Sequence, residues 1–121
     1  MNAITLVCGL PNSGKTTYST RYDTALHYDD ISRLSIKERD DVYRASNAEC
    51  FEGIFNTARS RRNILAQTKR ERKVCIWINT PLEVCLAREN RGRPPEVVLH
   101  HWQTFEPPTM DEGWDEVIVI E

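Results

Sequence analysis

The segment GLPNSGKT at residues 9–16 constrains the fold of this chain more than any other feature. It matches the spacing G-x-x-x-x-G-K-[ST], in which glycines let successive backbone N–H groups turn toward a phosphate. The apolar run AITLVC precedes it and a stretch of helical character follows it. A phosphate loop between a strand and a helix predicts a P-loop α/β fold: a small, mainly parallel sheet with helices on both faces.

This loop predicts a site for ATP and Mg²⁺. Lys15 is expected to reach the β- and γ-phosphates, and the Thr16 hydroxyl to bind the metal ion. The helix that begins here adds a partial positive charge at its N-terminus. The expected nucleotide contacts in the loop are Gly9, Pro11, Asn12, Ser13, Gly14, Lys15, Thr16 and Thr17. The loop does not reveal whether the phosphate is transferred, hydrolysed or only held.

Length and composition predict a single domain over residues 1–121. No apolar run approaches the roughly 18 residues that would cross a membrane, and the N-terminus lacks the features of a signal peptide. We therefore expect a cytoplasmic protein. The four cysteines show no zinc-ligand spacing, and the three in apolar contexts, Cys8, Cys75 and Cys85, are interpreted as buried thiols. The three histidines are interpreted as surface or packing residues.

Apolar patterning predicts four strands with helices between them. A helical pattern covers residues 35–65, as one helix or two, and leaves no apolar strand in that interval. The sheet is therefore expected to lack a third strand or to borrow one from a partner, and a homo-oligomer stays open. Strands are expected at 3–8, 24–28, 74–79 and 117–120, and further helices at 14–21, 81–90 and 96–105.

Asp29 and Asp30 follow the second expected strand. Catalytic groups gather at the carboxyl ends of strands in such sheets, so one of them could take the proton of an attacking hydroxyl. The alternative is that they cap a helix N-terminus. No acidic residue ends the strand 74–79, which stops at Asn79, so metal contacts beyond Thr16 would come from Asp29 or Asp30, from water or from the nucleotide.

Two basic segments invite a functional interpretation. Arg88, Arg91 and Arg93 surround a Gly-Pro break, and a mobile lid over about residues 86–96 could place an arginine on the transferring phosphate. The alternative is that they complement a helix dipole. Residues 59–73 carry seven Arg or Lys and one Glu, as a solvated helix face or as a patch for a polyanion.

Four segments together resemble the P-loop kinases related to phage-type polynucleotide 5′-kinase. They are GLPNSGKTT, the D-D-hydrophobic element that begins at Asp29, TPLEVCLARENRGRP and FEPPTMDEGWDEVIVI, in the order that this family has them. The resemblance implies that Lys15 and Thr16 hold ATP·Mg²⁺ and that Asp29, with Asp30 in reserve, is the general base. It also implies that Arg91 stabilises the transferring phosphate and that Arg33 contacts the acceptor phosphate. From the basic lid segment, Arg88 is expected at the nucleotide as well, and Arg93 at the acceptor.

The sequence departs from that family in two ways. The spacing from Asp to Arg fits Arg33 only if Asp30 is the base, and the third strand ending in D-x-T-N is missing, with Asn56-Thr57 as a remnant. The leading hypothesis is an ATP-dependent transfer of the γ-phosphate to a hydroxyl, above all the 5′-hydroxyl of a polynucleotide. The alternatives are a small-molecule kinase and an ATP-binding module without transfer.

Overall fold

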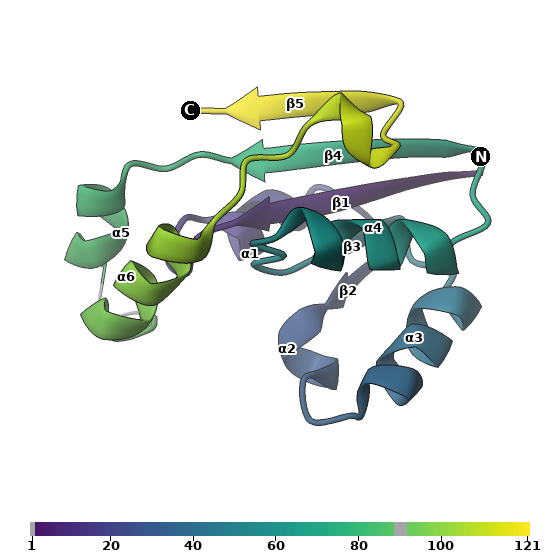
Figure 1. The fold of residues 1–121 in the computed structure, drawn as a ribbon, viewed down its shortest axis with the longest axis horizontal. Coiled ribbons are helices and arrows are strands. Elements are labelled where there is room, and N and C mark those ends of the chain that lie inside the picture. Colours follow the sequence, from purple (N-terminus) through teal and green to yellow (C-terminus); the bar gives the residue numbers. More distant parts are fainter. Residues whose placement is uncertain (1, 89–91) are drawn as a thin grey trace.

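A computed structural model describes residues 2–88 and 92–121 of the chain. Its centre is a five-stranded sheet in the order β2-β3-β1-β4-β5, and every pairing in it is parallel. The carboxyl ends of the strands therefore meet at one edge, next to α5 and α6 (Figure 1). The strands are β1 (Ala3–Gly9), β2 (Ala25–His27), β3 (Cys50–Glu52), β4 (Arg72–Ile78) and β5 (Glu116–Ile120).

Helices cover both faces of the sheet, as the sequence predicts. On one face Ile4 and Leu6 of β1 belong to the same buried cluster as Ile64 and Leu65 of α4. On the other face Val7 packs with aromatic side chains from α1 and the turn after it; α1 lies behind the sheet in Figure 1 and α4 in front. The helices are α1 (Lys15–Ser19), α2 (Tyr28–Ile31), α3 (Ile36–Ala45), α4 (Ala58–Gln67), α5 (Leu82–Ala87) and α6 (Pro95–Thr104), with a 3₁₀ turn η2 (Met110–Glu112).

The prediction that the third strand is missing is wrong. Residues Cys50–Glu52 form β3, which pairs with β1 on one side and β2 on the other. All three residues are buried because the strand is central in the sheet. The strand is only three residues long, and apolar positions at helical spacing lie in the sequence on both sides of it. The sequence pattern therefore gives no separate signal for this strand. The chain itself fills this position, so the sheet needs no strand from a partner.

The helical pattern over 35–65 consequently belongs to two helices. α3 begins at a capping box, in which the Ser35 hydroxyl accepts from Glu38 N and the Glu38 carboxylate accepts from Ser35 N. α4 begins after Thr57, whose hydroxyl accepts from Ser60 N at 3.1 Å. Polar N-caps therefore set both starts, and β3 lies between the two helices.

The basic segment 59–73 is partly internal, which neither interpretation of it predicts. Arg61 is fully buried, and its guanidinium donates to both carboxylate oxygens of Glu112, at 2.8 and 2.9 Å. It also donates to the carbonyls of Phe55 and Glu106, each at 2.6 Å. The Glu112 carboxylate accepts a further bond from Trp114. The DEGW sequence thus holds the segment before the last strand against α4 through the contacts of Glu112.

All four cysteines are free and buried, which confirms the expectation for Cys8, Cys75 and Cys85 and adds Cys50. Within the described residues, no helix is long and apolar enough to cross a membrane.

Candidate functional site: a phosphate loop facing an acidic side chain

The loop after β1 is shaped by two glycines with different constraints. At Gly9 a Cβ would lie only 2.7 Å from the carbonyl oxygen of Ile78, so the loop can leave the sheet here only without a side chain. Gly14 has φ of 100°, a left-handed conformation that favours glycine, and it caps α1. The sequence predicted both positions as nucleotide contacts, and the structure places Gly14 on the wall of a pocket.

Lys15 is the buried cation of the loop. It is 8% exposed, and its ammonium donates to the carbonyl of Leu10 at 2.8 Å. Burial lowers the pKa of this ammonium below its ordinary value, and the negative charges of Glu52 and Asp29 counteract that effect in part. A buried ammonium that donates to a neutral carbonyl is suited to an anionic ligand, because a phosphate would supply the opposite charge.

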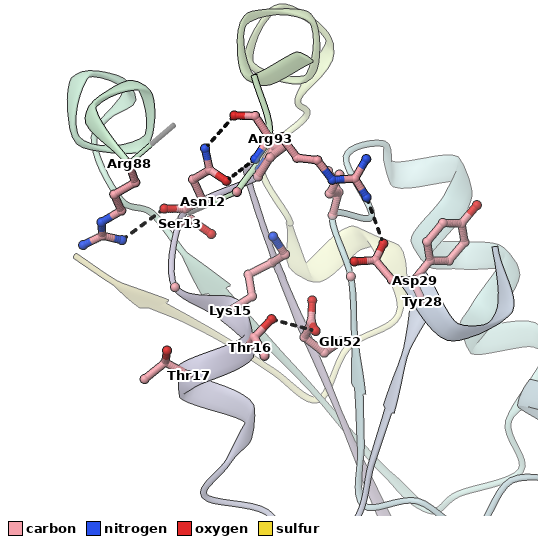
Figure 2. Close-up of a pocket in the computed structure, with 15 residues that line it drawn as sticks. Asn12, Ser13, Lys15, Thr16, Thr17, Tyr28, Asp29, Glu52, Arg88 and Arg93 are labelled. Atoms are coloured by element: carbon pink, nitrogen blue, oxygen red, sulfur yellow. Dashed lines mark hydrogen bonds and ion pairs between the residues drawn. The ribbon is translucent and has the colours of Figure 1, made fainter. Parts of the chain in front are cut away.

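A carboxylate that sequence analysis missed faces α1. Glu52 is the last residue of β3, and its Oε1 lies 3.4 Å from the Thr16 hydroxyl (Figure 2). The same oxygen lies 2.7 Å from Nδ1 of His27. Glu52 also lines the pocket. The signal in the sequence was an acidic residue after the short apolar pair Cys50-Phe51 and before Gly53. His27, interpreted from sequence as a surface or packing residue, instead contacts this acidic group.

Asn12 joins the phosphate loop to the predicted lid. Its side chain donates to the carbonyls of Cys85 and Arg93 and accepts from Arg93 N at 2.8 Å. The guanidinium of Arg88 donates to the backbone carbonyl of Asn12 at 3.0 Å. A Cβ at Gly92 would collide with the Asn12 side chain. Arg88, predicted as a nucleotide contact, thus lies against the phosphate loop, and Asn12 holds the segment after α5 through both its side chain and its backbone carbonyl.

Of the residues predicted to act at the acceptor, some line the far side of the pocket and others do not. Asp29 lines the pocket and pairs with Arg93, Oδ1 to Nη2, at 3.3 Å (Figure 2). Both side chains are more than half exposed. Asp30 and Arg33 are exposed and are not among the described residues that line this pocket. The predicted residue Arg91 lies outside the described residues.

The pocket as a whole has a volume of ≈ 660 Å³ and lies at the carboxyl edge of the sheet. Its lining includes Thr16 and Glu52, a hydroxyl and a carboxylate, which are the oxygen donors that Mg²⁺ prefers. Among residues 2–88 and 92–121 no group of three acidic, His or Cys side chains could hold a metal ion by itself. Thr16 and Glu52 could supply two ligands to an Mg²⁺ ion, and phosphate oxygens could supply further ones.

Comparison with known proteins supports the fold. No protein-family model matches the sequence, and no curated protein matches it at a significant level. Among solved structures, a gluconokinase from Sinorhizobium meliloti 1021 matches with a TM-score of 0.64 and 15% identity, over 98% of this chain and 82% of that one. At this identity the likeness shows that the two chains share a fold. The likeness does not favour polynucleotide kinases in particular.

Proposed function

We propose that this chain is an ATP-dependent kinase that transfers the γ-phosphate of ATP to a hydroxyl group of a small acceptor. The observation that carries the proposal is a single pocket in which Lys15 and Thr16 face Asp29 and Arg93. One end of this pocket offers a cation and a hydroxyl to a triphosphate. The other end offers a carboxylate to a hydroxyl, which a module that only held ATP would not need.

The residues divide the work as follows. Asp29 takes the proton from the acceptor hydroxyl, whose oxygen attacks the γ-phosphorus as ADP leaves. Lys15 neutralises charge on the transferring group, and Arg93 exchanges its ion pair with Asp29 for a contact with the acceptor. Thr16 and Glu52 would hold Mg²⁺, which supplies further neutralisation of the phosphate charge. Positioning and electrostatics would provide most of the acceleration.

Several observations favour a small acceptor over a polynucleotide. Two of the seven cations in the most basic segment are engaged within the protein, Arg61 by Glu112 and Arg70 by the carbonyls of Ala3 and Ser46, which reduces the cationic track that this segment could offer. A polynucleotide site needs such a track, because phosphate contacts supply most of the affinity. The likeness to a protein named as a gluconokinase supports the same choice.

The test is a kinase assay that follows both ADP release and labelled product. Acceptors would be a panel of sugars, sugar acids, polyols and nucleosides beside a 5′-hydroxyl oligonucleotide. We expect phosphorylation of a small acceptor, with kcat lowered about 10²- to 10⁴-fold in Asp29→Asn. Asp30→Asn is the matched control, because Asp30 is the adjacent acid outside the pocket, and it should keep the activity of the wild type.

Three results would count against the proposal. Faster phosphorylation of the oligonucleotide than of any small acceptor would return the polynucleotide hypothesis to first place. ATP binding with no product on the whole panel would leave a binding module. Equal loss of activity in Asp29→Asn and Asp30→Asn would remove Asp29 from the role of base.

A further inference from the structure

The Glu52 carboxylate has an unusual set of neighbours for a buried acid. It is 7% exposed, at the register position opposite His27 of β2 and Val7 of β1. Its Oε1 accepts a hydrogen bond from His27 Nδ1 at 2.7 Å, the closer of its two side-chain contacts, with Thr16 Oγ1 at 3.4 Å. A carboxylate removed from water needs such partners, because its desolvation is unfavourable by several kcal/mol.

Lys15 competes for the same carboxylate. The charge of Glu52 is the largest electrostatic influence that raises the pKa of the Lys15 ammonium against burial. Within the described part of the chain, however, the two side chains form no ion pair, and the ammonium donates to the Leu10 carbonyl instead. A glutamate has three rotatable side-chain bonds, so something must keep it from turning toward Lys15. A direct pair would neutralise the cation that a triphosphate needs.

We propose that His27 is the positioning residue that holds Glu52 against Thr16 and away from Lys15. The hydrogen bond from Nδ1 fixes the carboxylate, so the site presents a hydroxyl–carboxylate pair to the metal ion and an unneutralised ammonium to the phosphates. This inference rests on the proposed function, because it assigns a role within the same nucleotide site. Groups that orient a metal ligand without touching the metal typically change metal affinity or activity by about 10- to 100-fold.

The geometry of the contact defines informative variants. Nδ1 of histidine is bonded to Cγ, and so is the amide nitrogen of asparagine, so His27→Asn keeps a donor at the same distance from the backbone. His27→Leu removes the donor and keeps an apolar side chain of similar bulk. The matched control is His100→Leu, on α6, because His100 is exposed and does not line the pocket.

Binding is measured by calorimetry with the non-hydrolysable ATP analogue adenylyl imidodiphosphate, with Mg²⁺ and with chelator. We expect His27→Leu to weaken binding with Mg²⁺ about 10- to 100-fold. His27→Asn and His100→Leu should stay within about threefold of the wild type, which a simple packing role for His27 would not produce. In the Glu52→Ala background, His27→Leu should have no further effect, because His27 acts through Glu52.

The hydrogen bond itself is visible without any ligand. ¹⁵N NMR of the wild type should show a proton on Nδ1 of His27, and Glu52→Ala should change that signal. An unprotonated Nδ1, an asparagine variant as weak as the leucine variant, or additive losses in the double variant would each overturn the inference. If His27→Leu does not fold, the NMR spectrum and His27→Asn still decide. None of these measurements requires phosphate transfer, so an inactive enzyme would refute the proposed function alone.

Discussion

The Glu112→Ala substitution tests whether the buried ion pair with Arg61 is a central support of this fold. Both side chains are essentially inaccessible to solvent, and Arg61 makes four hydrogen bonds that join α4, the loop before it and the segment after α6. Removing Glu112 would leave a buried guanidinium with two carbonyl partners and no counter-charge. It would also leave the indole N–H of Trp114 without its acceptor.

The expected loss is large. Deleting one partner of a buried ion pair costs about 3–5 kcal/mol, because the remaining charge stays desolvated. Unfolding entropy of about 2.1 cal/mol/K per residue gives about 0.25 kcal/mol/K for 121 residues, so a loss of about 4 kcal/mol lowers Tm by about 16 °C. Natural domains have a free energy of unfolding of only about 5–15 kcal/mol, so this loss would leave the variant close to unfolding.

Urea unfolding followed by tryptophan fluorescence and thermal unfolding followed by circular dichroism measure this loss. The matched control is Glu116→Ala, which breaks the exposed pair with Arg72, where each side chain is about half exposed (53% and 48%). That pair should be worth about 0–1 kcal/mol. The double variant Arg61→Met/Glu112→Leu should recover most of the loss, because it leaves no buried charge. If Glu112→Ala is no less stable than Glu116→Ala, the assignment of Arg61 and Glu112 to the support of the fold is wrong.

Three further predictions concern acid stability, proton uptake and the lid. Burial raises the pKa of the Glu112 carboxyl, but hydrogen bonds from Arg61 and Trp114 outweigh it and lower the pKa below 4.5. The contribution of the ionised carboxylate to the free energy of unfolding is therefore complete above pH 4.5 and is lost as the pH falls below it. Urea unfolding at a series of pH values should show this dependence on pH in the wild type and lose it in Glu112→Gln. Burial lowers the pKa of the Lys15 ammonium. Just below pH 10.5, binding of ATP should therefore be accompanied by uptake of a proton, and this uptake should be absent in Lys15→Met. Calorimetry in buffers of different ionisation enthalpy measures the uptake. A methyl group at position 92 would displace the Asn12 side chain, which makes three hydrogen bonds to this segment. At about 1 kcal/mol for each bond, Gly92→Ala should speed tryptic cleavage after Arg88 by about 100-fold.

The two longest strands were predictable because each has a local cause. The strand before the phosphate loop is apolar and ends in glycine, and the strand beginning near Val74 is rich in β-branched and aromatic residues. Both were predicted to within about two residues, which is within the usual uncertainty of element ends. β3 was not predictable in the same way. Its three residues are stabilised by pairing with β1 and β2, and a strand made by its neighbours has no local pattern of its own.

The same distinction between local and tertiary causes applies to the residues of the candidate site. Lys15 and Thr16 belong to a contiguous motif and were identified from spacing alone. Asp29 was predicted together with Asp30, and only the folded chain separates them, because the first turn of α2 directs one of the two into the pocket. His27 and Glu52 stand 25 positions apart, and parallel strands bring them together.

By itself the sequence determined a phosphate loop, its strand-and-helix setting and a parallel sheet, because backbone geometry and hydrophobic patterning act over a few residues. The tertiary structure alone decided that a carboxylate accompanies Thr16, that Asp29 faces the loop, and that Arg61 supports the interior. Each of these depends on which side chains two distant segments bring into contact, and on the removal of water from between them. A buried charge is stable only when an opposite charge or hydrogen bonds compensate its desolvation. Only the folded chain shows which side chain provides that compensation.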